Sequence, residues 1–174
     1  MLLVQILILI ILLLIFVQDI LSRSVYWIVF PILVISFGTL RVISNKQIAD
    51  VPLNILVNCC FLALQLLLVS AWFSLRRGKL VNIMSELLGW GDILFLISIC
   101  FYLSVLNFLF FYIISLISIL LLWFGYQNTV VKKDRYIPLA GLQAILFMLF
   151  FITDQWVKHV DLTKDDWLLQ FIMG

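Results

Sequence analysis

Charged residues are scarce in this chain. Only 11% of its 174 residues are Asp, Glu, Lys or Arg, and 66% are hydrophobic, whereas a soluble domain carries about 25% charged residues. A soluble chain of this length has too much surface relative to its volume to bury so many apolar side chains. The composition therefore excludes a soluble globular protein and predicts an integral membrane protein of one domain.

Residues that bind metals or carry redox chemistry are also few. The three cysteines lie in apolar runs without CxxC spacing, and His159 is the only histidine. A zinc site needs several Cys, His or carboxylate ligands at characteristic spacings, so we expect neither a metal nor another cofactor. The basic residues form short groups without a stripe of interleaved aromatic residues, and no nucleic-acid partner is expected.

Long apolar runs occupy most of the chain. A bilayer core about 30 Å thick needs roughly 20 helical residues to cross it. Runs that fit this requirement predict membrane helices at Leu2 to Val17, Tyr26 to Ile43, Leu53 to Leu75 and Ile137 to Trp156. The first run has no basic segment before it and no small-residue cleavage site after it, so we expect a retained helix rather than a signal peptide.

The run from Ile93 to Phe124 is too long for one crossing, because a single helix of that length would extend about 48 Å. Two helices that turn near Ser104 to Asn107 explain it better, since Asn107 is the one strongly polar side chain in the middle. The prediction is an all-α bundle of about six transmembrane helices over residues 1–160. A short interfacial tail over residues 161–174 would follow, with Thr163 as a helix cap.

Loop charges predict the orientation of this bundle. With six crossings, one side carries the larger basic groups, which are Arg23, Arg76, Arg77, Lys79, Lys132, Lys133 and Arg135. The positive-inside rule makes that side cytoplasmic. Both chain ends then lie on the non-cytoplasmic side. A single helix over Ile93 to Phe124 would move the group around Lys132 to the opposite side, which also favours two helices.

Two carboxylates lie at boundaries of apolar runs on the expected cytoplasmic side. Asp19 is at the end of the first run, and Asp92 opens another in the sequence Gly89-Trp90-Gly91-Asp92. Ionisable side chains at membrane depth are costly, so each is a candidate functional residue. Two carboxylates held close share a proton and titrate as a unit, as in aspartic proteases. Gly89 and Gly91 let the backbone approach a substrate or adopt a positive φ.

The same residues also have a plainer interpretation. An Asp that caps a helix at a membrane boundary is common, a four-residue Gly-x-Gly-Asp pattern is weak, and Asp19 can simply mark the end of a membrane helix. Glu86 and Asp134 fall on the same expected side, but each lies in a polar loop, where a solvated charge is the default.

The architecture and these short stretches resemble the type IV prepilin peptidases, intramembrane aspartic proteases with a Gly-x-Gly-Asp signature. The resemblance implies a catalytic pair at Asp19, within the stretch Asp19 to Ser24, and at Asp92. Lys132 to Ala140 resembles the family's entry into its last helix. The implied function is an endopeptidase that cleaves the leader of pilin-like precursors at the cytoplasmic face of the bacterial inner membrane. Because paired CxxC motifs are absent, no N-methyltransferase activity is expected.

Other functions remain open at this point. Leu94 stands where the family often has Lys, and Tyr26-Trp27 where an Ile-Pro pair is common. A non-catalytic scaffold, or a degenerate relative that binds pilin-like helices, would not need both carboxylates. A transporter is a third alternative, although polar side chains at mid-depth are few; they are Asn58, Gln65, Asn107 and Gln143. Membrane lipids are expected partners in every case, because the basic groups suit anionic headgroups.

Overall fold

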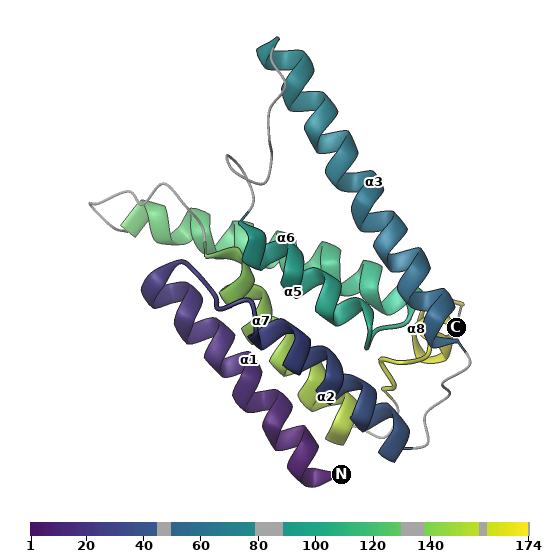
Figure 1. Ribbon diagram of the computed structural model, residues 1–174. Helices are drawn as coiled ribbons and strands as arrows, with labels where there is room; N and C mark the ends of the chain where they lie inside the picture. Colours follow the sequence, from purple (N-terminus) through teal and green to yellow (C-terminus); the bar gives the residue numbers. More distant parts are fainter. Residues whose placement is uncertain (45–49, 79–88, 130–137, 157–159, 174) are drawn as a thin grey trace.

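The chain is helical throughout the regions that the computed structural model describes, which are residues 1–44, 50–78, 89–129, 138–156 and 160–173. The helices are α1 (Leu2–Ser22), α2 (Val29–Ile43), α3 (Val51–Arg77), α5 (Trp90–Cys100), α6 (Val105–Thr129), α7 (Leu139–Trp156) and α8 (Asp166–Met173) (Figure 1). No strand occurs within these ranges. The predicted all-α class is confirmed.

Four of the helices are long and apolar enough to cross a membrane, and these are α1, α3, α6 and α7. The chain is therefore a multi-pass membrane protein. Helices α2 and α5 are apolar but have only 15 and 11 residues. At 1.5 Å per residue they rise about 22 and 16 Å, less than the roughly 30 Å core. The total of six crossings stays a prediction.

The predicted division of the longest apolar run is confirmed. Helix α5 ends at Cys100, α6 begins at Val105, and residues 101–104 between them are not helical. Asn107 lies in the first turn of α6 rather than in the connection. At the other end of the chain, α1 continues to Ser22 instead of stopping at Val17, so Asp19 is part of the helix.

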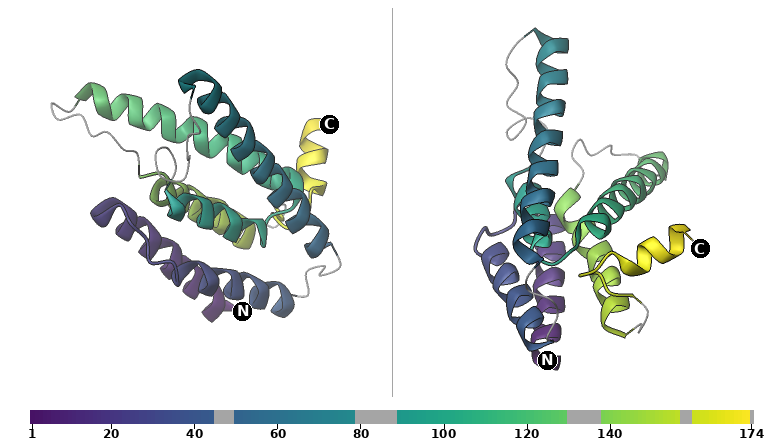
Figure 2. Two further views of the ribbon diagram at one scale, coloured as in Figure 1. Left: turned by 45° about the horizontal axis from the view of Figure 1, so that its top comes forward. Right: turned by 90° about the vertical axis from the view of Figure 1, so that its right-hand side faces the viewer.

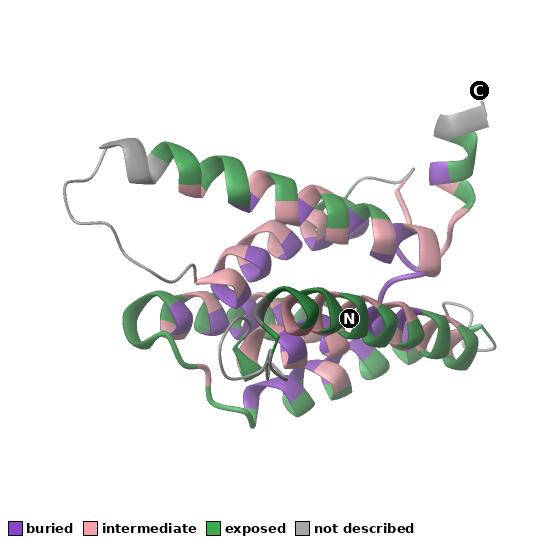
Figure 3. Ribbon diagram, turned by 90° about the horizontal axis from the view of Figure 1, so that it is seen from above, coloured by how far each residue is buried: buried purple, intermediate pink, exposed green. Residues whose placement is uncertain are grey.

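The membrane helices form three layers, with α1 and α2 in the first, α5 and α7 in the middle, and α3 and α6 in the third (Figure 2). Helix α7 is the most buried of the four long helices. In its most apolar stretch 39% of the residues are buried, against 11% in the corresponding stretch of α3. Outward faces of the helices are exposed and inward faces are buried (Figure 3). The exposed faces are rich in Leu and Ile, as contact with lipid requires.

Aromatic packing joins the layers at Phe147 of α7. Its ring contacts Phe37 of α2, Phe95 of α5 and Phe111 of α6, with ring centroids 5.8, 6.3 and 5.4 Å away. All three pairs have the edge-to-face geometry that aromatic rings prefer. The four side chains are buried. Phe147, in the middle layer, therefore packs against both outer layers.

The C-terminal segment folds back onto the start of α6. Ser104 Oγ and Leu106 N both donate to Asp165 Oδ1, at 2.5 and 3.1 Å, and Trp167 Nε1 donates to Asn107 Oδ1 at 3.1 Å. The first N–H groups of a helix have no acceptor within it. Asp165 therefore supplies an acceptor at the start of α6 from a distant part of the chain.

The predicted cap of the tail helix is wrong. Helix α8 begins at Asp166, three residues after Thr163, and the Thr163 hydroxyl donates to Asp161 Oδ1 at 2.6 Å. Asp161 is two residues away and accepts this hydrogen bond, and the contact lies in a turn before the helix starts. The interfacial location of residues 161–174 stays a prediction.

We expect Asp165→Ala to lower the stability of the protein by about 1 kcal/mol, the usual effect of a lost helix cap. The substitution removes the acceptor of Ser104 Oγ and Leu106 N. The melting temperature of the purified protein in detergent measures this. Asp166→Ala, whose side chain is exposed, is the matched control and should melt like the wild type. Equal shifts for both variants would contradict the role of Asp165.

Candidate functional site

Asp19 is held at the end of α1 and is only 7% exposed. Its Oδ2 accepts a hydrogen bond from Gly141 N at 2.6 Å. The helix ends at Ser22, and the next residue, Arg23, has a φ of 52° and donates its N–H to Asp19 O at 2.9 Å. A residue in the left-handed region stops a helix. Asp19 is thus fixed in the last turn, on the side of α1 that faces α7.

Asp92 is held at the start of α5. Its Oδ2 accepts from Gly89 N at 3.0 Å, while Asp92 N donates to Gly89 O at 3.1 Å. An acidic side chain that reaches back to the N-cap backbone in this way satisfies a free N–H group. The other oxygen, Oδ1, accepts from Ala140 N at 2.7 Å. The capping role expected of this residue is therefore real, and a contact to α7 accompanies it.

The two carboxylates bind consecutive backbone N–H groups in the first turn of α7, those of Ala140 and Gly141. Such groups have no acceptor within their helix and carry partial positive charge. Three segments far apart in the sequence meet here: the end of α1, the start of α5 and the start of α7. The two side chains are thereby held next to each other at the start of α7.

Gly141 permits this close approach of α1 and α7. A Cβ atom at this position would lie 3.0 Å from Asp19 Cβ and 3.2 Å from the Phe16 carbonyl oxygen. Real Cβ atoms rarely approach backbone so closely, and tightly packed regions absorb added atoms only by shifting. The absence of a side chain at residue 141 is therefore a condition of the contact with Asp19.

The glycines of the Gly-x-Gly-Asp stretch are less constrained. Gly89 has a φ of −69°, and Gly78 is the one glycine with positive φ among the described residues. Neither Gly89 nor Gly91 has a positive φ, so of the two uses predicted for these glycines only close approach to a substrate stays a prediction. A Cβ at Gly89 would lie 3.3 Å from Asp92 Oδ2, which is tight, whereas one at Gly91 would meet Val25 at an ordinary 3.8 Å.

Sequence reasoning identified both carboxylates but missed what holds them. The only available signal for Gly141 was the pair of small residues that directly follows Pro138 and Leu139. Other predicted features lie outside the described residues, namely Glu86, Asp134, His159 and the stretch Lys132 to Ile137. In the regions that are described, no three His, Cys, Asp or Glu side chains gather as a metal site would require.

A second buried polar cluster, at the opposite end of α7, was not predicted. Asp154 accepts hydrogen bonds from the Tyr102 hydroxyl, from Gln155 Nε2 and from Leu162 N, the last at 2.7 Å. Arg41, which is 3% exposed, donates to the Tyr102 carbonyl oxygen at 2.6 Å. These contacts join α2, the α5–α6 connection, α7 and the C-terminal segment, so we interpret the cluster as a structural link.

The paired carboxylates can both accept and donate protons. Two carboxylates that are close enough to interact strongly cannot both ionise easily, and such a pair shares one proton. Asp19 Oδ1 has no hydrogen-bond partner within the described part of the chain, which leaves it available to a water molecule or a substrate. The chain matches no family model, no curated protein and no solved structure. Its function is therefore inferred from this geometry.

We expect Gly141→Ala to destabilise the protein by about 1–3 kcal/mol, the usual cost of adding an atom to a filled site. The new methyl group would force α1 away from α7 at Asp19. Thermal unfolding in detergent measures the loss. Gly38→Ala is the matched control, because nothing lies within 4 Å of the Cβ it would add, and helix propensity favours Ala there. A Gly141→Ala protein as stable as the wild type would show that the close contact is unimportant.

Proposed function

We propose that this protein is an intramembrane aspartic endopeptidase of the prepilin peptidase type, with Asp19 and Asp92 as its catalytic pair. The observation that carries the proposal is the binding of both carboxylates to consecutive N–H groups of α7. The Gly-x-Gly-Asp stretch and the position of Asp19 at the end of α1 agree with the resemblance noted in the sequence. The substrate is a pilin-like precursor with a basic leader followed by an apolar helix.

The proposed reaction uses the shared proton of the pair. The ionised carboxylate takes a proton from water as the water oxygen attacks the carbonyl carbon of the scissile peptide bond. The protonated carboxyl group gives its proton to the carbonyl oxygen, which yields a tetrahedral diol. The C–N bond then breaks. The proton taken from water passes to the leaving nitrogen, one diol proton returns to the other carboxylate, and the pair regains its starting state.

Preorganisation supports this assignment. Asp92 is held by two backbone N–H groups and Asp19 by one, so neither carboxylate must be ordered when a substrate arrives. Catalytic groups fixed in advance lower the entropic part of a reaction barrier. The contacts from Ala140 and Gly141 come from a helix rather than from a loop, and a helix positions such groups more exactly.

The proposed orientation follows from the charge distribution. The basic groups that include Arg23 and Arg76 face the cytoplasm of a bacterium, and the carboxylate pair lies at that face of the inner membrane. A precursor with a basic leader would arrive from this side while its apolar helix remains in the membrane. The basic groups on the protein would repel a basic leader. We therefore assign them to the binding of anionic lipid headgroups.

The catalytic proposal predicts that Asp19→Asn and Asp92→Asn each reduce cleavage at least about 10³-fold, since catalytic residues that act as a unit fail together. Asn keeps the size of Asp but cannot share a proton. The assay is cleavage of a co-expressed pilin-like precursor, followed by the size of the product in membranes that contain equal amounts of each variant. Asp166→Asn, an exposed site in α8, is the matched control.

Two results would contradict this function. Cleavage at the wild-type rate by either Asn variant would show that the paired-carboxylate mechanism is wrong. Failure of the wild type to cut several precursors that it nevertheless binds would favour the alternative, a non-catalytic protein that holds pilin-like helices.

Cysteine labelling tests the orientation separately. In a background where Cys59, Cys60 and Cys100 are replaced by Ala, single cysteines are introduced as Ser24→Cys and Asp50→Cys, both at exposed positions at opposite ends of the bundle. A maleimide that cannot cross membranes should label intact cells of the Asp50→Cys variant only. Disrupted cells should show labelling of both. The reverse pattern in intact cells would invert the proposed orientation.

A further inference from the structure

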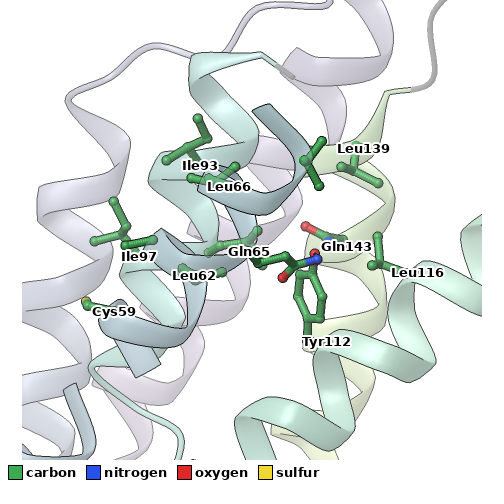
Figure 4. A pocket seen from close by; sticks show the side chains of 13 residues that line it. Cys59, Leu62, Gln65, Leu66, Ile93, Ile97, Tyr112, Leu116, Leu139 and Gln143 are labelled. Atoms are coloured by element: carbon green, nitrogen blue, oxygen red, sulfur yellow. The ribbon is translucent and has the colours of Figure 1, made fainter. Parts of the chain in front are cut away.

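A pocket of about 490 Å³ lies between the middle layer and the third layer of the bundle. Helices α3, α5, α6 and α7 all contribute to its wall (Figure 4). Its volume is in the range of pockets that hold a specific ligand. In its lining Ala63 is exposed, and several other residues are only half-buried, namely Leu66, Val69, Ile97 and Leu116. The pocket therefore opens at the surface of the bundle, which in a membrane protein faces lipid.

The surface that this pocket offers to an occupant is almost entirely apolar. Gln65 and Gln143 belong to the lining, but their amide oxygens are enclosed by protein and have almost no accessible surface. The amide nitrogen of Gln65 donates to the Tyr112 hydroxyl, so this donor is already used. A polar occupant would give up its hydrogen bonds to water without gaining others, which is costly. The pocket therefore suits a hydrocarbon.

An apolar space of this size is not left empty beside a bilayer. Protein interiors are densely packed, and atoms that line a void lose their contacts on one side. Helix α3 has fewer such contacts than its neighbours, because it is the least buried of the four long helices and packs mainly against α5 and α6. A hydrocarbon chain from the adjacent lipid would supply the packing that α3 lacks.

The pocket is as long as one leaflet of a bilayer is thick. Its lining on α3 extends from Cys59 to Val69, which corresponds to about 15 Å along the helix axis. The hydrocarbon core of a bilayer is about 30 Å thick, so the acyl chains of one leaflet span about 15 Å. A single acyl chain therefore fits along this wall of the pocket.

A basic residue continues the side of α3 that faces the pocket. Leu62 and Val69 line the pocket, and Arg76 follows Val69 by the same interval of seven residues, which is two helical turns. Arg76 is exposed and has no hydrogen bond or ion pair with any residue that the structure describes. It lies about 10 Å beyond Val69 along the axis, and its long side chain can reach the headgroup region.

We propose that this pocket holds one acyl chain of an anionic phospholipid, and that Arg76 binds the phosphate of the same lipid. A guanidinium group donates two parallel N–H groups to phosphate oxygens. A zwitterionic headgroup carries its own cation beside the phosphate, and Arg76 would repel that cation. The site therefore selects lipids with a net negative charge. The bound lipid holds α3 against the middle layer, whether or not the protein is a peptidase.

Photolabelling tests the site directly. The probe is a phosphatidylglycerol that carries a diazirine in one acyl chain, added to the purified full-length protein in detergent, and mass spectrometry locates the labelled residues. We expect the labels to concentrate on residues that line the pocket. Unlabelled phosphatidylglycerol should displace the probe at about one tenth of the concentration that phosphatidylcholine with the same chains needs, the difference expected for one hydrogen bond between charged groups.

Substitutions at the two ends of the site should change the labelling. Arg76→Gln removes the phosphate ligand and should lower the affinity for phosphatidylglycerol about tenfold. Ala63→Trp adds bulk at the pocket wall and should abolish the labels there. The matched controls are Arg23→Gln, an exposed arginine at the end of α1, and Ala71→Trp, an exposed position on α3 outside the pocket lining. Both controls should be labelled like the wild type.

Thermal unfolding supplies a second readout of the same site. A ligand that binds only the folded state raises the melting temperature. Phosphatidylglycerol should therefore stabilise the wild type and Arg23→Gln, and it should have little effect on Ala63→Trp. Melting temperatures without added lipid identify any variant that does not fold, and Arg76→Gln, at an exposed position, is expected to fold normally.

Several results would overturn the proposal. Labels spread evenly over the outward faces of the helices would show that lipid only surrounds the bundle. Equal displacement by both lipids, or unchanged labelling of Arg76→Gln, would reject the selection of anionic headgroups. Displacement of the probe by a pilin-like precursor would assign the pocket to a protein helix instead. None of these measurements requires cleavage, so the lipid site and the catalytic pair are accepted or rejected separately.

Discussion

The start of α7 constrains the rest of this structure. Backbone N–H groups in a membrane must find acceptors within the protein, because the bilayer core holds no water that could accept their hydrogen bonds. Here the first turn of α7 finds two in the side chains of Asp19 and Asp92. The same contacts bring together the end of α1 and the start of α5, and they set two carboxylates beside each other. The same pair of side chains therefore provides acceptors for the free N–H groups of α7 and the two carboxyl groups that acid–base chemistry needs.

Packing around α7 explains why this pair stays in place. Phe147 joins the two outer layers through edge-to-face contacts, and the buried cluster around Asp154 closes the far end of the same helix. Helix α7 also packs against α1. Helix α3, by contrast, buries little of its surface. The fold thus combines a firmly held side, which carries the carboxylate pair, with a loosely held wall, and the pocket lies between them.

Several features of the site followed from residue type and spacing. Asp19 and Asp92 stand out because charges are rare in apolar runs, and the loop charges predict that both lie on one side of the membrane. The split near Ser104 followed from helix length, from the polar Asn107 in the middle of the run and from the loop charges. Gly141 could not be predicted, because its role depends on how closely α1 approaches. Gln65 and Gln143 were visible as rare polar residues, but only their shared pocket distinguishes them from Asn58, which donates to the Leu103 carbonyl oxygen at 3.3 Å.

The sequence by itself determined that this is a helical membrane protein and where most of its helices lie, because hydrophobicity and bilayer thickness act locally along the chain. It also marked the two carboxylates, since a charge at a membrane boundary is conspicuous in any context. Only the tertiary structure decided what these residues contact. The meeting of Asp19, Asp92 and the first turn of α7 joins segments separated by up to 122 residues, and the pocket needs four helices at once. Such arrangements depend on packing between distant segments, which local pattern does not specify.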